Sequence, residues 1–571
     1  MEKTAVLTRL DGAFSKFPRI LLLPIGAVLT ALCLVFPQVG FLEWLAMVPA
    51  LCYLLREIED GRMTLRRAYL LGFLYFYCFY LVIWHWFVDL YPMEFAGISE
   101  GAAIGLIAIC WFGLSLLQTI FSALIFPVFL LLSRTRYLRR FGFLLPVLFA
   151  SVYTVSEWSQ TLTWAGVPWA RLALGQSGCG ILFHSISLFG SYFLTFAIVA
   201  VNALAAYAIL HLDKVKLIGI LCACVFGFNL LSGVVGYLTL RGDNGEGTTV
   251  AAVQGNVGSA NKWEVGTAAK SKDTYAKYTK AAAAAGAKVV VFPETFIPYS
   301  ISSNNDLGKF VLELAVEEQV TVRCGAFYHS ADGGYYNGLF TAYPDGTFSE
   351  TVYAKRRLVP FGEFVPMRSI VEVLVPVLAD MGMLDRDLDA GYDSEIVETP
   401  IGDAGSLICF DSIYEDLTLD AVRDGATYIC LSTNDSWFRD SAGIYMHLRQ
   451  AQMRAVESGR YIIRAADTGI SAIITPTGEC LDEKGALVEG VSIATIHSRT
   501  DRTLYSYIGN LLVYLLIAVE LALALTLLID RIRRKRAASA AACEAEAALT
   551  TDADASQTVT ESENDPQDPS E

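Results

Sequence analysis

The chain has 571 residues, of which 54% are hydrophobic and only 18% are charged, and its mean hydropathy is +0.45. This composition excludes an ordinary soluble protein and is typical of a membrane protein, and the length predicts at least two domains. The net charge of −15 argues against nucleic-acid binding, which needs basic surfaces.

Apolar runs long enough to cross a bilayer follow one another from the amino terminus. They lie at 19–36, 39–55, 67–88, 103–132, 141–158, 181–210 and 215–238, and one more lies at 505–530. A polar stretch separates the last run from the others. We therefore predict a polytopic α-helical membrane bundle of about eight spans. An N-terminal membrane domain (1–243) holds seven of them, a globular domain follows at 248–500, and the last span lies at 503–530.

The distribution of basic residues predicts the orientation of this bundle. The segments with Lys or Arg are 56–67, 134–140, 214–216 and 531–536, and the alternate connections without them are 37–41 and 89–102. The positive-inside rule then places both termini in the cytoplasm and the 248–500 domain outside it. Residues 537–571 are rich in Ala, Glu, Asp, Ser and Thr, so we expect a disordered acidic cytoplasmic tail.

The connection at 159–180 is amphipathic and contains tryptophans, which fits an interfacial anchor or direct contact with a substrate. Glu157 precedes it at the outer end of a span, where an unpaired charge is costly. Helix pairing and a functional role each explain that carboxylate.

The cysteines and histidines do not form a recognisable metal or disulfide pattern. The 12 cysteines are scattered, no CxxC pair or HExxH motif occurs, and several cysteines lie inside apolar runs. The histidines His85, His184 and His211 lie in or beside apolar runs and are interpreted as structural. We therefore expect neither a metal nor another cofactor.

The 248–500 domain has the pattern of an α/β fold. Short apolar or β-branched segments predict its strands: TTVAAVQGN, KVVVFPE, TVRCGAF, NGLFTAY, GSLICF, TYICLSTND and YIIRAA. They alternate with helical stretches such as 265–285, 307–318 and 444–458. Loops at strand ends are the usual place for chemistry in such domains.

Three strand-end segments deliver reactive side chains. VVVFPE ends at Glu294, AKRRLVPFGEFVP contains Lys355 and Glu363, and ICFD contains Cys409. A lysine favours the thiolate form of a nearby cysteine, a carboxylate can take the thiol proton, and the ammonium can stabilise an oxyanion. These groups suffice for acyl transfer through a thioester. Taken singly, however, each residue fits a structural interpretation, with Cys409 as a core thiol.

The order of these segments resembles the nitrilase superfamily, whose Cys, Glu and Lys form a catalytic triad on an α-β-β-α sandwich. A nitrilase-like domain inserted before a last span is similar to bacterial apolipoprotein N-acyltransferases. VQGNVGSANKW at 253–263, STNDSWFRDSAG at 432–443, the EW pair at 157–158 and GVPW at 166–169 extend the likeness. It covers roughly residues 15 to 530.

The resemblance implies a role for each matching residue. Cys409 becomes the acylated nucleophile, Glu294 the general base and Lys355 the oxyanion support. It also implies supporting or substrate-binding roles for Glu363, Trp263, Trp437, Phe410 and Asp411. The family commonly has Cys-Tyr-Glu where this chain has Cys409-Phe410-Asp411. This departure affects the fine geometry or the substrate preference of the site and leaves the reaction class unchanged.

The implied reaction transfers an acyl chain from a phospholipid to the α-amino group of a diacylglyceryl-cysteine lipoprotein, in the bacterial cytoplasmic membrane. The implied partners are the phospholipid, the diacylated lipoprotein and membrane lipid, and we expect a monomer. Three alternatives stay open: a membrane-tethered amidase or acyltransferase acting on another amine or amide, a transporter, and a nonenzymatic binding module. The few ionisable residues in the spans argue against a transporter, and the intact triad argues against a binding module.

Overall fold

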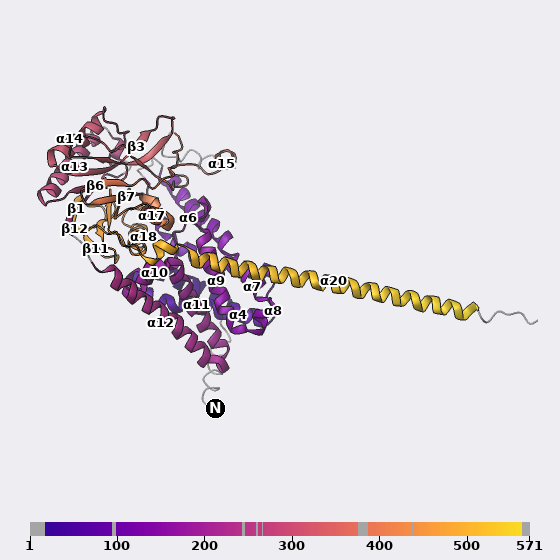
Figure 1. Cartoon of the computed structure of the whole chain (residues 1–571). Coiled ribbons are helices and arrows are strands. Elements are labelled where there is room, and N and C mark those ends of the chain that lie inside the picture. Colours follow the sequence, from indigo (N-terminus) through magenta and orange to yellow (C-terminus); the bar gives the residue numbers. More distant parts are fainter. Residues whose placement is uncertain are drawn as a thin grey trace, which may run out of the picture.

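The computed structural model describes residues 18–93, 99–242, 246–258, 261–264, 266–374, 386–436 and 438–561. Side chains are described up to Ala545, and not for Trp263. The chain forms a helical bundle and an α/β domain, from which a long C-terminal helix departs (Figure 1).

Six helical segments of the described chain are long and apolar enough to cross a membrane. They are Pro37–Glu59, Leu65–Leu90, Glu100–Ser133, Ser191–Leu210, Leu212–Leu240 and Leu511–Ala545. The other two predicted spans coincide with shorter helices, α2 (Leu22–Val35) and α9 (Leu145–Ser159). Proline limits both, because Pro37 follows the end of α2 and Pro146 lies in the first turn of α9. The predicted membrane bundle is thus confirmed, with six long helices and two shorter ones.

The individual helices of the bundle are shorter than these segments because turns and 3₁₀ stretches interrupt them. Besides α2 and α9 they are α3 (Glu43–Ala46), α4 (Val48–Glu59), α5 (Leu65–Ile83), α6 (Glu100–Ser122), α7 (Ile125–Ser133), α8 (Arg136–Arg140), α10 (Ile186–Phe189), α11 (Ser191–Leu210), α12 (Val215–Leu240), α19 (Leu504–Ile508) and α20 (Leu511–Glu561). Helix α20 continues through residues 537–561, for which the sequence predicts disorder. Ala and Glu, which are frequent there, are strong helix formers and extend a helix that is already nucleated.

The α/β domain contains two six-stranded sheets. The first has the order β12 (Gly490–His497), β1 (Gly247–Gln254), β2 (Val289–Val291), β3 (Thr321–His329), β4 (Tyr335–Ala342) and β5 (Tyr353–Ala354). The second has the order β11 (Cys480–Lys484), β10 (Ser471–Ile474), β9 (Ile462–Ala466), β8 (Tyr428–Thr433), β7 (Gly402–Ile408) and β6 (Val397–Thr399). The central pairs are parallel and the edges antiparallel. The central strands are apolar on both faces, as parallel strands require.

Helices cover the outer face of each sheet. One core lies between the sheets, and another lies between the first sheet and the helices α13 (Thr267–Ala284) and α14 (Asp306–Glu318). The second sheet is covered by α17 (Glu415–Arg423) and α18 (Ala442–Ser458), whose core continues into the membrane bundle. This is the predicted α-β-β-α sandwich, and it sits directly on the bundle.

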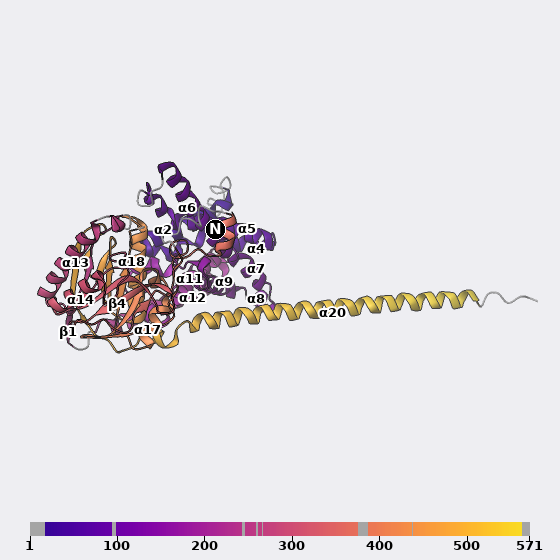
Figure 2. The same ribbon diagram turned by 90° about the horizontal axis from the view of Figure 1, so that it is seen from above.

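Helix α18 is the main contact between the two parts, and it lies between the second sheet and the bundle (Figure 1). Seen from above, α20 points away from the α/β domain (Figure 2). From α18, Arg449 donates hydrogen bonds of 2.6 and 3.2 Å to the carbonyls of Leu34 and Val35 at the end of α2. Nearby, Arg171 of the bundle forms a buried ion pair with Glu415 of α17 at 2.8 Å. These contacts hold the strand-end loops of the second sheet at a fixed place above the bundle.

The carboxylate of Glu157 is used for pairing within the bundle. It accepts hydrogen bonds from the Leu172 amide at 2.9 Å and from the Thr195 hydroxyl at 2.7 Å. The connection at 159–180 thus folds back onto α9 and α11, which supports the helix-pairing interpretation of this buried acid.

Candidate active site

The sheets bring together the three residues that the sequence singled out. Glu294 follows β2, Lys355 follows β5, and Cys409 follows β7 at the start of the 3₁₀ helix η11 (Cys409–Ile413). All three therefore stand where a strand ends and the chain turns into a loop, at the facing edges of the two sheets.

Lys355 is shared between two carboxylates. Its Nζ lies 2.8 Å from Oε1 of Glu294 and 2.9 Å from Oε1 of Glu363, and all three side chains are at most 13% exposed. Asn337 of β4 donates to the same two oxygens, at 2.7 and 3.2 Å. Burial opposes the charge on Lys355, but the two carboxylates hold the pKa of the ammonium well above its usual value.

The second oxygen of each carboxylate is held by the backbone. The amide of Asn434 donates to Oε2 of Glu294 at 3.0 Å, and the amide of Val359 donates to Oε2 of Glu363 at 2.9 Å. Both acids are therefore fixed in orientation. Such preorganisation is what a proton-transfer and oxyanion site requires.

Cys409 has a left-handed backbone, with a φ of +49°. This conformation is costly for a residue other than glycine, by roughly 1–3 kcal/mol. Asp411 stabilises it by accepting hydrogen bonds from the Ile408 amide at 3.0 Å, the Arg357 amide at 2.8 Å and the Tyr353 hydroxyl at 2.8 Å. Asp411 thus clamps the turn that presents the thiol.

The surroundings of the Cys409 thiol disfavour its ionisation at rest. Burial raises the pKa of the thiol and the charge of Glu294 raises it further, whereas Lys355 lowers it. Asp435 also raises this pKa, by less than Glu294. The thiol therefore needs a base. Asp435 is already paired with His447 and Arg464, so Glu294 is the candidate. Cys409 is also partly exposed, in contrast to Cys324 and Cys430 on the strands β3 and β8, which are fully buried.

The structure shows where three of the predicted supporting residues lie. Glu363 lies beside Lys355, and Asp411 holds the turn. The half-buried ring of Phe410 packs edge-on against Tyr414, with the ring centres 5.6 Å apart. The side chain of Trp263 and the residue Trp437 lie outside the described part of the chain. All five supporting roles stay predictions.

Sequence reasoning missed a second set of buried polar residues around the thiol. They are Asn337 on β4, Asp435 after β8, His447 on α18 and Arg464 on β9, each no more than 2% exposed. A polar residue inside an apolar strand, as in the segment YIIRAA, was the available signal. The sequence alone does not indicate which buried partner such a residue meets.

Three of these side chains invite comparison with a metal site. Potential ligand atoms of Cys409, Asp435 and His447 lie within 4.8 Å of one another. Asp435 is already paired with His447 at 2.8 Å and with the guanidinium of Arg464 at 2.5 Å. A metal cation would have to displace these contacts beside a fixed positive charge, so we assign no metal to this group.

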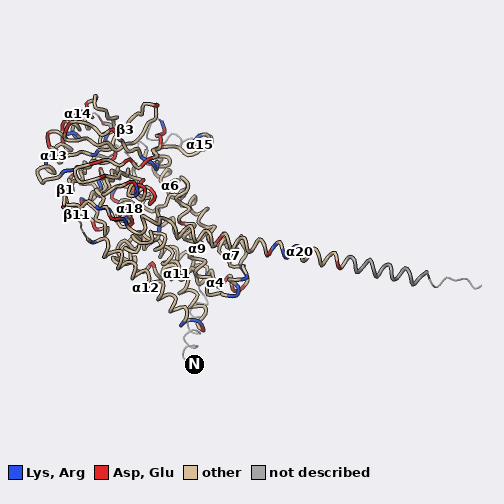
Figure 3. Tube along the Cα trace, in the orientation of Figure 1, with Lys and Arg blue, Asp and Glu red and all other residues tan. Residues whose placement is uncertain are grey.

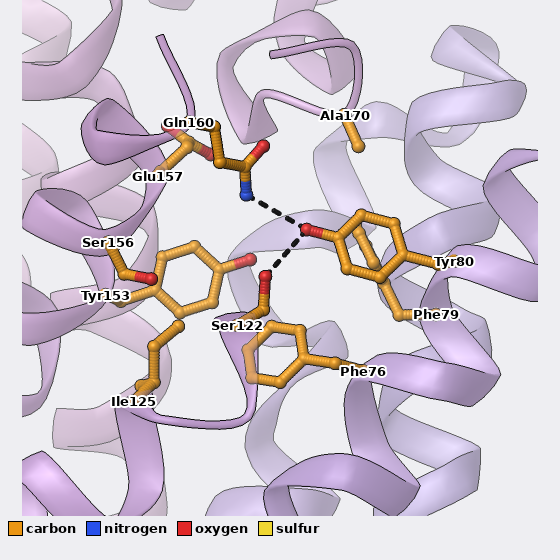
Figure 4. A pocket seen from close by; sticks show the side chains of 10 residues that line it. All are labelled: Phe76, Phe79, Tyr80, Ser122, Ile125, Tyr153, Ser156, Glu157, Gln160 and Ala170. Carbon is orange, nitrogen blue, oxygen red and sulfur yellow. Dashed lines mark hydrogen bonds between the residues drawn. The ribbon is translucent and has the colours of Figure 1, made fainter. Parts of the chain in front are cut away.

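A separate cavity lies inside the bundle, between α5, α6 and α9 (Figure 4). Its volume is about 10 Å³, and Tyr80 connects Gln160 and Ser122 across it through hydrogen bonds of 3.0 and 2.9 Å. One water needs roughly 10–15 Å³. The cavity is therefore too small for an acyl chain and is not a substrate site.

Two family patterns match the chain. The pattern of the carbon-nitrogen hydrolases matches residues 249–504, and the pattern of the apolipoprotein N-acyltransferase N-terminal domain matches residues 26–204. The first contains the whole triad, and the second covers most of the bundle.

Curated relatives match over most of their length. The apolipoprotein N-acyltransferase of Gloeobacter violaceus is 29% identical over 498 residues, which are 86% of this chain and 91% of the relative. That of Geobacter metallireducens is 25% identical over 527 residues, which are 88% of this chain and 95% of the relative. Among solved structures, a Saccharomyces cerevisiae member of the nitrilase superfamily matches 46% of this chain and 93% of its own, with 19% identity and a TM-score of 0.35. The two family patterns and the curated relatives together place the chain among the apolipoprotein N-acyltransferases, multi-pass membrane acyltransferases with a carbon-nitrogen hydrolase domain.

Proposed function

We propose that this chain moves an acyl chain from a phospholipid to the α-amino group of a diacylglyceryl-cysteine lipoprotein, through a thioester on Cys409. The observation that carries the proposal is the placement of Cys409 on a strained turn beside the Glu294–Lys355 pair, whose atoms lie 2.8 Å apart. The names of the relatives supply the acceptor, an apolipoprotein, and the transfer of an acyl group to nitrogen.

In the first half-reaction, Glu294 takes the proton of the Cys409 thiol while the sulfur attacks the ester carbonyl carbon of the phospholipid. Lys355 donates a hydrogen bond to the carbonyl oxygen as it becomes negative. The carbon–oxygen bond then breaks, and the leaving glycerol oxygen receives the proton from Glu294. A lysophospholipid departs, and the acyl chain stays on sulfur.

In the second half-reaction, the amine of the lipoprotein attacks the thioester carbonyl. Glu294 takes a proton from the nitrogen, the carbon–sulfur bond breaks, and the sulfur regains the proton. The product carries an amide-linked third acyl chain. The same two residues serve both steps, so no cofactor is required by the chemistry.

The arrangement of charge supports a position of this site at the outer membrane surface. Charged residues gather in the α/β domain and at the opposite end of the bundle, with few between them (Figure 3). The opposite end contains the basic loops after α4 and around α8. By the positive-inside rule these loops are cytoplasmic, so the α/β domain is extracytoplasmic and both termini are cytoplasmic. We expect the protein to act as a monomer.

Product analysis tests this function. The purified protein is incubated with phospholipid vesicles and a diacylated lipopeptide, and the products are followed by mass spectrometry. We expect one lysophospholipid for each N-acylated lipopeptide, and none of either with Cys409→Ala. Hydrolysis of an added amide, without acyl transfer from the phospholipid, would instead favour a membrane-tethered amidase, and transfer to an unrelated amine would favour another acyltransferase.

A further inference from the structure

A second buried ion pair lies beside the turn that presents Glu294. Lys262 belongs to the 3₁₀ helix η10 (Asn261–Trp263), and its Nζ lies 2.8 Å from Oδ2 of Asp467, the residue that follows β9. The two side chains are 3% and 0% exposed. Burial of two charges is costly, and the acyl-transfer steps proposed above use neither residue.

The ammonium group of Lys262 also contacts the backbone of the Glu294 turn. Its Nζ donates a hydrogen bond of 2.9 Å to the carbonyl of Thr295 and a longer one, of 3.4 Å, to the carbonyl of Glu294. An ammonium carries three protons, and these two carbonyls and the carboxylate of Asp467 are three acceptors. Lys262 therefore connects the backbone at Glu294 to the end of β9.

The Glu294 turn needs support because its backbone is strained. Thr295 has a φ of +43°, a left-handed conformation that is rare for a β-branched residue. Strand β3 packs closely against the same turn, since a Cβ atom at Gly325 would lie 2.7 Å from the Cα of Glu294. The amide of Phe296 also donates to the carbonyl of Gly325 at 3.2 Å. Strand β3 and Lys262 together fix the turn.

Asp467 is itself anchored to other strand ends. Its Oδ1 accepts a hydrogen bond from the amide of Val257 at 3.2 Å, and its carbonyl accepts one from the amide of Asn256 at 2.8 Å. Both donors follow β1. The amide of Asp467 donates to the carbonyl of Thr433, at the end of β8, at 3.2 Å. The ion pair thus ties the Glu294 turn to the ends of β1, β8 and β9.

The position of this backbone decides where the carboxylate of Glu294 lies. Lys355, Asn337 and the amide of Asn434 hold its two oxygens, but they do not hold the turn from which the side chain starts. A shift of the turn would carry the carboxylate away from the Cys409 thiol. Displacements of about 1 Å are enough to slow an enzymatic reaction strongly.

We propose that Lys262 is a positioning residue for Glu294. Its ammonium, paired with Asp467, holds the left-handed turn that sets the distance between the Glu294 carboxylate and the Cys409 thiol. In this role Lys262 neither transfers a proton nor contacts the substrate. The inference rests on the proposed function only in taking Glu294 as the base for Cys409.

The test variant removes both charges of the pair. Lys262→Met alone would leave the carboxylate of Asp467 buried without a cation, which can prevent folding. Lys262→Met/Asp467→Asn avoids this and keeps an oxygen that accepts from the amide of Val257. We expect this double variant to fold, because a buried ion pair can often be replaced by neutral groups of similar volume without loss of stability.

The measured quantity is the rate at which p-nitrophenyl butyrate acylates Cys409, followed by the release of nitrophenolate in the first turnover. The rate of Cys409→Ala is subtracted. In the double variant we expect the rate at neutral pH to fall about ten-fold, because the base is displaced. A folded double variant with the parental rate would overturn the proposal.

The effect must also depend on Glu294. When Glu294→Gln is added to the parent and to the double variant, a residue that acts through the base has nothing left to position. We expect these two proteins to differ by less than about two-fold at the same pH. A ten-fold difference that persists would contradict the proposal, because it would show general damage or an effect through the neighbouring Trp263.

Lys262→Gln replaces the double variant should the latter not fold. Its shorter side chain keeps an amide donor and loses the charge. We expect a decrease of about three-fold, which likewise disappears in the presence of Glu294→Gln. An unchanged rate, or a decrease that persists without the base, would overturn the proposal.

Lys272→Met is the matched control. Lys272 also donates to a backbone carbonyl, that of Asp306 at 3.2 Å, but in an exposed contact. We expect its rate to equal that of the parent. The ester needs neither phospholipid nor lipoprotein, so a parent that reacts with the ester and not with phospholipid would contradict the proposed function and leave the test of Lys262 intact. If only phospholipid acylates the parent, the same comparison is made with phospholipid.

Discussion

Buried ion pairs occur both at the active site and at the contact between the α/β domain and the bundle, but they are built differently. At the active site, one ammonium serves two carboxylates next to a partly exposed thiol. At the contact, the guanidinium of Arg171 is fully surrounded: it pairs with Glu415 at 2.8 Å and donates to Ser191 at 2.9 Å and Tyr192 at 2.8 Å.

The difference shows how similar groups perform separate tasks. A charge whose partners are shared and lie beside a reactive atom can respond when new charge develops there. A charge that is fully buried and whose partners all lie inside the protein holds two surfaces together and is out of reach of a substrate. Substitutions at the two places should therefore change different measured quantities.

Substitution of Lys355 should have the largest effect on activity. In Lys355→Met the oxyanion loses its donor, and Glu294 and Glu363 are left buried without a cation. We expect the rate of Cys409 acylation to fall by about a thousand-fold or more. Lys277→Met is the control, because Lys277 pairs with Glu489 on the exposed surface at 3.2 Å. Comparable decreases in the rate of Cys409 acylation in both variants would mean that Lys355 has no specific role.

Removal of the proposed base, Glu294, should have the second largest effect on activity. Glu294→Gln keeps the shape of the side chain but cannot take the thiol proton. We expect acylation to slow by at least about a hundred-fold at neutral pH, with recovery at alkaline pH as the thiol ionises without help. Glu489→Gln is the surface control. A variant that keeps the parental rate and pH profile would exclude Glu294 as the base.

A smaller loss should follow from Asn337→Ala. This change removes the donor that holds Glu294 and Glu363 at 2.7 and 3.2 Å. Because Lys355 still contacts both acids, we expect a decrease in kcat of about ten-fold. Asn305→Ala, which removes the side-chain cap of α14, should lower thermal stability and leave kcat unchanged. Equal kcat values in the two variants would contradict a role of Asn337 in the site.

Breaking the domain contact should change activity least. We expect Glu415→Gln to alter acylation per folded molecule by no more than about two-fold, and to lower the free energy of unfolding by about 3–5 kcal/mol. Asp416→Asn, next in the chain and half-exposed, is the control and should have a much smaller effect on stability.

The same contact has a defined pH dependence. Burial disfavours the charge of Glu415, but Arg171 and Arg454 lower the pKa of its carboxyl from 4.5 to about 2. A carboxyl whose pKa is lower in the folded state binds fewer protons there, so its stabilisation is complete above pH 4.5 and is lost as the pH falls toward 2. The stability difference between the parent and Glu415→Gln should narrow in that range. A difference independent of pH would contradict the ion pair.

Local patterns were enough to predict the fold class. Each of the seven strand segments identified in the sequence overlaps a strand, because runs such as VVV in β2 can be buried only in the middle of a sheet. Short or edge strands such as β5 (Tyr353–Ala354) and β6 (Val397–Thr399) were not identified, since two or three residues carry no period. Pro37 follows the first apolar run, and α2 (Leu22–Val35) is shorter than the span predicted at 19–36.

The candidate site was predictable where a motif supplies the residue and unpredictable where a distant partner defines it. Glu294, Lys355 and Cys409 each end a recognisable segment. Asn337 and His447 gain their place only when β4 and α18 pack beside the triad, and their neighbours in sequence do not indicate this. The clamping by Asp411 likewise depends on the left-handed backbone of Cys409.

Intact-mass spectrometry of the detergent-purified protein, incubated with phospholipid alone, tests the central claim most directly. The account predicts one added acyl group that hydroxylamine removes and that is absent in Cys409→Ala. A folded parent protein without such an adduct, across phospholipids of varied head group and chain length, would contradict a thioester on Cys409.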